Sequence, residues 1–261
     1  MHFFRLLNKE MVQLRRILIE QERLKYITNE SKNLKLNSNE SHYLRRVVRL
    51  KKGDILEVVD GFGHLWKASL AEQNFINFTS AFTEPIKSFK RNSPLICLAV
   101  VVPKKGFDDF IRMACEIGVD FIQPLISHRS APKLDIKMTR LLDISREAVE
   151  QSERMWMPKI YPPQQFHSWL DNLPSNASFS IACTRKDKLL TSDLWFKTLP
   201  KSINYVWMVI GPEGGWTNEE EILANEFGLV PVSLGQNILR TSTASIVASS
   251  QLISIRDKFK G

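Results

Sequence analysis

The sequence has few cysteines, and none of them is placed to bind a metal. The 261-residue chain holds Cys97, Cys115 and Cys183, and no two of them form a CxxC pair. Paired cysteines at short spacing are the usual signature of a zinc site or a thiol–disulfide centre. Because each cysteine stands among apolar residues, we expect three buried, reduced thiols and no metal.

Long apolar runs are also missing. The longest, such as Leu95–Val102 and Val206–Ile210, have the length of a β-strand, whereas a membrane-spanning helix needs roughly 18 apolar residues. The start of the chain lacks the apolar segment and cleavage site of a secretory signal. We therefore expect a cytoplasmic protein without a membrane span, in which residues 1–10 form a dispensable extension before Met11.

The familiar nucleotide-binding fingerprints are absent. The glycine-rich segment GPEGG at 211–215 does not fit GxxxxGK[ST], and no GxGxxG follows an early strand. The first absence excludes a P-loop, and the second argues against a dinucleotide-binding Rossmann domain. A ligand site built on this glycine loop must therefore belong to another class.

Positive charge is present in excess and is concentrated near the N-terminus. Residues 1–90 hold 16 Lys and Arg against 10 Asp and Glu, whereas residues 91–261 hold 20 against 18. A basic module joined to a nearly neutral one is typical of an RNA-binding domain attached to a catalytic domain. A generally basic protein without nucleic-acid binding is the plainer alternative.

The basic segment has the pattern of a small β-barrel. Short strand-like segments alternate with the turn sequences LKKGD at 50–54 and DGFGH at 60–64. We predict strands over Arg16–Ile19, Ile55–Asp60, Leu65–Leu70 and Ile76–Phe82. The polar segment 84–94 then reads as a linker to a second domain.

One basic helix is predicted in this first domain, over Ser41–Leu50. Its apolar residues Leu44, Val47 and Val48 should face inward. Arg45, Arg49 and Lys52, spaced at i, i+4 and i+7, should then share an exposed face.

The rest of the chain alternates strands with helices, which indicates a parallel sheet covered on both faces. We predict strands over Leu95–Val102, Phe121–Ser127, Phe179–Cys183, Tyr205–Ile210 and Leu229–Leu234. We predict helices over Phe107–Ile117, Met138–Gln151 and from about Thr241 to the C-terminus, the last with Val247, Gln251, Ile255 and Phe259 on its apolar face.

Two loops that follow buried strands are the best candidates for chemistry. The first, Ile210–Glu220, contains three glycines and a proline, and its Thr217 and Glu220 should form a capping box for the next helix. The second, Leu234–Ser245, has Gly235 near its start and carries Ile238, Leu239 and Arg240. Glycines let the backbone approach a ligand at the carboxyl end of a strand. Plain structural turns remain the alternative.

This pair of loops resembles the SPOUT class of methyltransferases, and in particular the family of 16S rRNA (uracil-N3) methyltransferases (RsmE). The likeness covers nearly the whole chain. It is carried by the segments HYLRRVVRLKKGD at 42–54, MACEIGVDFIQPLISHRS at 113–130, REAVEQSERMWMP at 146–158, VIGPEGGWTNEE at 209–220 and LGQNILRTSTAS at 234–245. One departure is Ser242, where the family commonly has Glu.

The resemblance implies an α/β fold in which a SPOUT-type parallel sheet with a C-terminal trefoil knot follows a small PUA-like β-barrel. The domains would span residues 11–88 and 93–261. It further implies a homodimer that methylates small-subunit rRNA with S-adenosylmethionine (SAM). The implied cofactor-binding residues are Ile210, Gly211, Pro212, Glu213, Gly214, Leu234, Gly235, Ile238, Leu239 and Arg240.

Methylation of uracil N3 sets its own requirements. The N3 proton must leave, and the resulting charge spreads over O2 and O4, so cationic donors and a proton acceptor are needed. We predict Arg154 and Arg240 as the donors and Glu213 as the acceptor or as a residue that orients the loop. The plainer alternatives are a solvated Arg154 and a turn-capping Glu213.

The target uridine must be unpaired or flipped out, because N3 lies on the Watson–Crick edge. The predicted phosphate contacts are Arg15, Arg16, Arg45, Arg46, Arg49, Lys51 and Lys52. Trp156 and Trp216 are candidates to stack on a base, although core tryptophans are the plainer reading.

Two other functions remain open at this point. One is a SPOUT methyltransferase that acts on another atom, such as a ribose 2′-hydroxyl. The other is an inactive RNA-binding or ribosome-assembly factor, to which Ser242 gives some support.

Overall fold

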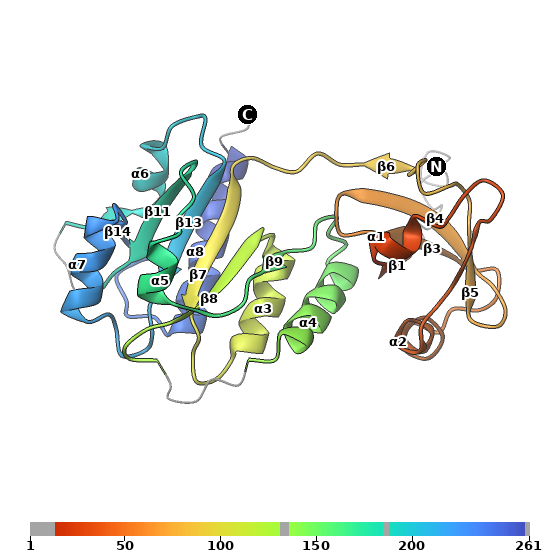
Figure 1. The fold of residues 1–261 in the computed structure, drawn as a ribbon, viewed down its shortest axis with the longest axis horizontal. Coiled ribbons are helices and arrows are strands. Elements are labelled where there is room, and N and C mark those ends of the chain that lie inside the picture. Colours follow the sequence, from red (N-terminus) through yellow and green to blue (C-terminus); the bar gives the residue numbers. More distant parts are fainter. Residues whose placement is uncertain (1–13, 131–135, 185–187, 259–261) are drawn as a thin grey trace, which may run out of the picture. The chain divides into compact units, whose positions relative to one another are not determined.

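A computed structural model describes residues 14–130, 136–184 and 188–258 of the chain (Figure 1). The chain divides into two compact units, residues 1–90 and 91–261. The predicted extension over residues 1–10 lies outside the described residues, as does Phe259.

The first unit is built on a six-stranded sheet with the order β1-β3-β4-β5-β2, in which β6 also pairs with β4. β1 runs parallel to β3, and the other pairs are antiparallel. The strands are β1 Arg15–Leu18, β2 Asn33–Lys35, β3 Ile55–Val59, β4 His64–Leu70, β5 Phe75–Phe78 and β6 Lys87–Ser88. The predicted strand over Ile76–Phe82 therefore ends early, at Phe78, and a turn follows it.

The predicted basic helix is wrong in its bounds and at one residue of its inner face, since Val48 packs against the core as expected. Besides the short α1 (Gln21–Leu24), the unit has α2 over Ser38–His42, which continues as a π-helix, η1, over Tyr43–Val47. Asn37 and Glu40 form the capping box that starts α2. Leu44 is buried as expected, but Val47 is 59% exposed.

The predicted basic face does not form, because the helix ends before Arg49. Arg49 has a φ of 59°, in the left-handed region. Residues other than glycine rarely adopt this backbone conformation, and it does not occur within a right-handed helix. Arg45, Arg49 and Lys52 therefore do not lie on one helix.

The second unit is built on an eight-stranded parallel sheet with the order β10-β8-β7-β13-β11-β14-β12, in which β9 also pairs with β8. The strands are β7 Leu95–Val101, β8 Phe121–Ile126, β9 Lys159–Ile160, β10 Gln164–Gln165, β11 Ala177–Ala182, β12 Leu190–Thr191, β13 Tyr205–Ile210 and β14 Val230–Ser233. The predicted parallel sheet is confirmed, with β7 and β13 buried at its centre.

Helices cover both faces of this sheet (Figure 1). They are α3 Phe107–Ile117, α4 Met138–Gln151, α5 Phe166–Leu170, α6 Ser192–Lys197, α7 Asn218–Glu226 and α8 Thr241–Lys258. One apolar cluster joins α3, α4, α6 and α8 to the sheet, and a second joins α5 and α7 to it. Two-sided cover explains why the central strands are apolar without alternation.

The predicted bounds of α3 and α4 are confirmed. α3 ends where Gly118 adopts a φ of 115° and its N–H donates to the carbonyls of Ala114 and Cys115. Only glycine adopts this conformation without strain, which makes it a reliable stop signal.

The predicted apolar face of α8 is only partly confirmed: Ile255 packs against the core, but the predicted residues do not form the most buried stripe. Val247, Gln251 and Ile255 are half-buried, while the fully buried stripe begins with Thr241, Ser245 and Ser249. The hydroxyls of Ser245 and Ser249 each donate to the carbonyl four residues earlier, at 2.8 and 2.7 Å. A serine whose hydroxyl is hydrogen-bonded within its own helix can be buried in close packing, much as alanine can. A prediction based on large apolar residues does not detect such a face.

No helix among the described residues is long and apolar enough to cross a membrane.

Candidate cofactor and catalytic site

A cavity of about 290 Å³ lies at the carboxyl edge of the parallel sheet. It is bounded by the segments that follow β8, β11, β13 and β14. Ligands of parallel α/β sheets bind at this edge, where several loops converge. The two loops singled out in the sequence, after β13 and β14, form most of its wall.

The loop after β13 packs so closely against Trp216 that only glycine fits at position 211. A Cβ atom on Gly211 would lie 2.7 Å from Nε1 of Trp216. The indole of Trp216 is buried and its ring centroid lies 4.7 Å from that of Phe166. The carbonyl of Gly211 also accepts a hydrogen bond from the hydroxyl of Thr241 at 2.8 Å, which fixes the loop to the start of α8.

Thr217 and Glu220 form the predicted capping box at the start of α7. The Thr217 hydroxyl accepts from the Glu220 N–H, and the Glu220 carboxylate accepts from the Thr217 N–H at 2.9 Å. The other oxygen of Glu220 accepts from the backbone N–H of His128 at 2.9 Å. One carboxylate thus joins the glycine loop to the segment after β8.

Arg129 makes a second connection between these two segments. Its guanidinium donates to the carbonyls of Gly214 at 2.8 Å and Trp216 at 3.2 Å. Its side chain also passes close to Gly214, where an added Cβ would meet Arg129 Cδ at 3.3 Å. Arg129 therefore fixes the path of the glycine loop along the cavity.

The loop after β14 supplies an apolar wall. Leu234 and Leu239 pack against the core, while the side chain of Ile238 is 63% exposed at the cavity. Gly235 has a φ of 144°, and its N–H donates to the hydroxyl of Ser233 at 3.2 Å. An exposed isoleucine beside glycine backbone is a surface that a flat, partly apolar ligand would cover.

The structure brings nine of the ten predicted cofactor-binding residues to this cavity. They are Ile210, Gly211, Pro212, Glu213, Gly214, Leu234, Gly235, Ile238 and Leu239. Arg240 is exposed at the end of the same loop but does not line the cavity. Their part in binding a cofactor stays a prediction.

Two other segments contribute residues to the cavity. Arg129 follows β8, and its place after the predicted strand Phe121–Ser127 makes a ligand-side position plausible for His128 and Arg129 from sequence alone, without a role. Ala182, Cys183 and Thr184 end β11 or follow it, and sequence reasoning missed them. They carry no glycine pattern, although their position after a parallel strand could have selected them.

Two of the predicted catalytic residues, Glu213 and Arg240, lie on the loops of this edge. Glu213 lines the cavity, and both side chains are exposed. The structure shows no ion pair for either one within the described part of the chain. Both are therefore available to a substrate.

The third, Arg154, lies at the opposite edge of the sheet. Its guanidinium donates to the carbonyls of Cys115 at 2.8 Å and Val119 at 2.6 Å, and lies 3.6 Å from the carboxylate of Asp120. These residues precede β8. A six-residue strand is roughly 20 Å long, so the structure does not bring Arg154 to the glycine loops of its own chain.

Arg154 belongs instead to a buried cluster around Asp120. Arg91 and Arg256 also pair with this carboxylate, at 3.1 and 3.5 Å. Burial lowers the pKa of Arg154, and the nearby Asp120 opposes that shift. The cluster ties the start of β8 to α8 and to the segment after α4. Arg154 is neither the solvated residue of the plainer reading nor part of the cavity.

One of the two candidate tryptophans, Trp216, is not free to stack on a base, and stacking by Trp156 stays a prediction. Trp216 is only 8% exposed and forms part of the core. Trp156 is half-buried, with the Arg91 guanidinium 5.0 Å from its ring centre.

The predicted phosphate contacts of the first unit differ in availability. Arg16 is 7% exposed and pairs with Glu57, its Nε lying 3.1 Å from Oε2, so its predicted contact is wrong. Arg45 donates to the carbonyl of Ala71, and Lys52 pairs with Glu72, both at 2.6 Å. The contacts left exposed and without an ion pair in the described chain are Arg15, Arg46, Arg49 and Lys51.

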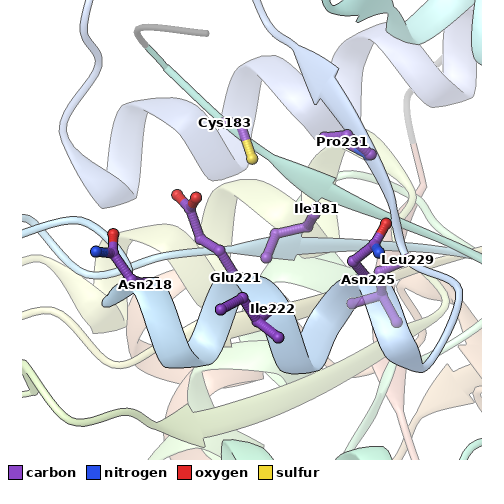
Figure 2. Close-up of a pocket in the computed structure, with 8 residues that line it drawn as sticks. All are labelled: Ile181, Cys183, Asn218, Glu221, Ile222, Asn225, Leu229 and Pro231. Carbon is purple, nitrogen blue, oxygen red and sulfur yellow. The ribbon is translucent and has the colours of Figure 1, made fainter.

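A second pocket, of about 450 Å³, adjoins the cavity (Figure 2). Figure 2 shows Asn218, Glu221, Ile222 and Asn225 on α7, with the Glu221 side chain extending toward Cys183. Cys183 and Glu221 line both spaces. Among the residues that the structure describes, no three His, Cys, Asp or Glu side chains are grouped to hold a metal ion.

Comparison with known proteins shows which families this chain resembles. A family model described as an RNA methyltransferase domain matches residues 90–253, and one described as an RNA methyltransferase PUA domain matches residues 36–79. A Synechocystis protein named ribosomal RNA small subunit methyltransferase E is 38% identical over 81% of this chain and 69% of its own length.

Solved structures agree with this match. A methyltransferase from Legionella pneumophila, solved with bound SAM, has a TM-score of 0.79 and 28% identity, covering 93% of this chain and 98% of its own. A ribosomal RNA small subunit methyltransferase E from Neisseria gonorrhoeae, also bound to SAM, has a TM-score of 0.75 and 26% identity, covering 92% and 97%. The α/β fold and the PUA domain are thereby confirmed.

Proposed function

Since this chain belongs to the ribosomal RNA small subunit methyltransferase E family, we propose that it methylates N3 of a uridine in small-subunit ribosomal RNA. Membership makes it a SAM-dependent rRNA methyltransferase. The observation that supports the site is the convergence of the two glycine loops on one cavity at the carboxyl edge of the sheet.

The residues of this cavity fit SAM. Gly211 and Gly214 line the cavity without side chains, and Leu234, Ile238 and Leu239 offer apolar surface for an adenine ring. The carboxylate of Glu213 lies on the same wall and suits the cationic parts of the cofactor. Bound SAM would supply an electrophilic methyl group on a sulfonium.

Glu213 and Arg240 would carry the chemistry on the RNA. In the proposed reaction, the Glu213 carboxylate would accept the N3 proton while N3 takes the methyl group and the sulfonium would leave as a neutral thioether. Arg240 faces the oxygens over which the uracil charge spreads and stabilises it. Both side chains are exposed at the loops, so the base can reach them.

A catalytic part for Arg154 would require a second chain. Within one chain its guanidinium is committed to Cys115, Val119 and Asp120. We propose a homodimer on the family resemblance, and only its partner chain could bring an Arg154 to these loops.

The first unit would hold the RNA. Arg15, Arg46, Arg49 and Lys51 are the exposed cations that suit phosphate contacts, with Arg45 and Lys52 beside them. We propose domains over residues 11–88 and 93–261, a trefoil knot in the second domain and action in the cytoplasm. The target uridine is flipped out or unpaired.

Transfer of labelled methyl from SAM to small ribosomal subunits tests this function. The subunits come from a strain that lacks the gene, and the product nucleoside is identified by mass spectrometry. A 3-methyluridine product is expected. Methyl on another atom, such as a ribose 2′-oxygen, would overturn the target. No transfer and no SAM binding would leave the inactive RNA-binding reading.

A further inference from the structure

A further cavity, separate from the two described above, lies at the same edge of the sheet, outside the cofactor loops. It has a volume of about 620 Å³. The segment after β7, the first residues of α3 and the start of α4 line it. Nothing in the proposed reaction uses these residues.

Positive side chains dominate this cavity. Lys104, Lys105, Lys137 and Arg140 line it, against Asp108 and Asp109. Arg140 pairs with Asp108 at 2.6 Å, and Asp109 lies 3.8 Å from Arg112.

Lys104 and Lys105 keep their charge unopposed. Both are exposed, and the described residues give neither of them an ion-pair partner. The cavity therefore offers two adjacent ammonium groups to an anion from solvent.

The cavity lies close to the cofactor site. β7 and β13 are neighbours, with Val100 paired to Ile210, and neighbouring strands are about 4.8 Å apart. Lys104 and Lys105 leave the end of β7 just as Gly211 leaves the end of β13. An RNA strand whose target base enters the cofactor cavity must pass its backbone near this edge.

We propose that Lys104 and Lys105, with Lys137 and Arg140 beside them, bind the phosphodiester backbone of the RNA strand next to the target nucleotide. This inference rests on the proposed function and adds an RNA contact on the catalytic unit itself. Phosphate contacts fix the register of a strand without reading its sequence. Here they hold the flanking nucleotides while the uridine is presented to the methyl donor.

The test compares two double variants of the full-length protein. Lys104→Gln with Lys105→Gln removes two charges at the cavity. The control, Lys197→Gln with Lys201→Gln, removes two exposed charges from the same unit at the opposite edge of the sheet. Binding to a single-stranded rRNA fragment is measured over a salt series, and SAM affinity is measured by calorimetry.

The cavity variant is expected to bind RNA about tenfold more weakly, with a salt slope lower by about 1.4, since each single-strand phosphate contact contributes about 0.7. SAM affinity should not change, and the control should behave as wild type. Equal RNA affinity and slope in the two variants would overturn the proposal.

The proposed function is tested independently of this cavity. If the wild type transfers no methyl group to small subunits, the function is wrong. The RNA-binding comparison still decides the cavity, because it does not depend on methyl transfer.

Discussion

The guanidinium of Arg129 donates to the carbonyl oxygen of Gly214 at 2.8 Å, across 85 residues of sequence. This contact joins the segment after β8 to the glycine loop after β13. Trp216 accepts a second bond from the same nitrogen. A loop that must present its backbone to a ligand is thereby held in one conformation before the ligand arrives.

Replacing Arg129 with alanine should weaken SAM binding. A hydrogen bond to a charged group stabilises by about 1.5–3 kcal/mol, so losing this contact should raise the Kd at least tenfold. Calorimetry measures the Kd, and Arg112→Ala on the surface of α3 is the control. A Kd unchanged from wild type would show that the loop keeps its path without Arg129.

Gly211→Ala should abolish SAM binding while the protein stays folded. The new Cβ would lie 2.7 Å from Trp216 Nε1, so either the indole or the loop must move. Trp216→Leu in the same chain should restore part of the affinity by making room. Gly214→Ala is the milder comparison, because its Cβ meets only the flexible Arg129 at 3.3 Å. Normal binding by Gly211→Ala would contradict this account.

Arg154 and Arg240 should behave differently when each becomes alanine. Arg240→Ala should lower methyl transfer about 100-fold or more without changing the Tm, as expected for lost charge stabilisation. Arg154→Ala should destabilise the protein by about 2–3 kcal/mol, because it leaves two carbonyls and Asp120 short of a partner.

Thermal unfolding and single-turnover methyl transfer separate these two roles. If Arg154→Ala keeps its Tm and loses activity, Arg154 reaches the substrate, and a partner chain must bring it there. If Arg240→Ala turns over normally, Arg240 has no part in the chemistry.

Much of the fold could be predicted because its signals are local. Gly118 stops α3, and Thr217 with Glu220 starts α7. The two glycine loops could be predicted because each one follows a buried strand directly and contains glycine. These features depend on residues within one turn of each other.

The remainder depends on contacts across the chain. Arg154 was predicted as catalytic, and only the tertiary fold shows that its guanidinium caps the carbonyls of Cys115 and Val119. Arg16 pairs with Glu57 on the neighbouring strand, 41 residues away, and nothing near Arg16 in the sequence indicates this partner. Sequence spacing does not tell a solvated arginine from one with a buried partner.

Charge reversal at Arg46 and Arg49 should weaken RNA binding and lower its salt slope by about 1.4, the value for two single-strand phosphate contacts. Both residues are exposed and have no ion pair in the described chain. Lys87→Glu with Lys90→Glu, elsewhere on the same unit, is the control. An equal salt slope in the two variants would mean that this surface does not contact the RNA.

Glu219 should make the stability of the protein depend on pH in the acid range. The pKa of its carboxyl is lowered from the ordinary 4.5, first by the backbone N–H of Glu219 and then by the hydroxyl of Thr217. A lowered folded pKa stabilises the protein above pH 4.5, and this contribution is lost as the pH falls through the folded value. Glu219→Gln should therefore be less stable than wild type at pH 7, and the difference should vanish in acid.

The matched control is Glu226→Gln at the other end of α7, where a negative charge opposes the helix dipole. Its stability at pH 7 should equal or exceed that of wild type. Urea unfolding of the three proteins at pH 7 and pH 3 measures these differences. If Glu219→Gln matches wild type at pH 7, the hydrogen bonds to the Glu219 carboxylate do not stabilise the start of α7, and the loop is held by the Thr217–Glu220 capping box, Arg129 and Thr241.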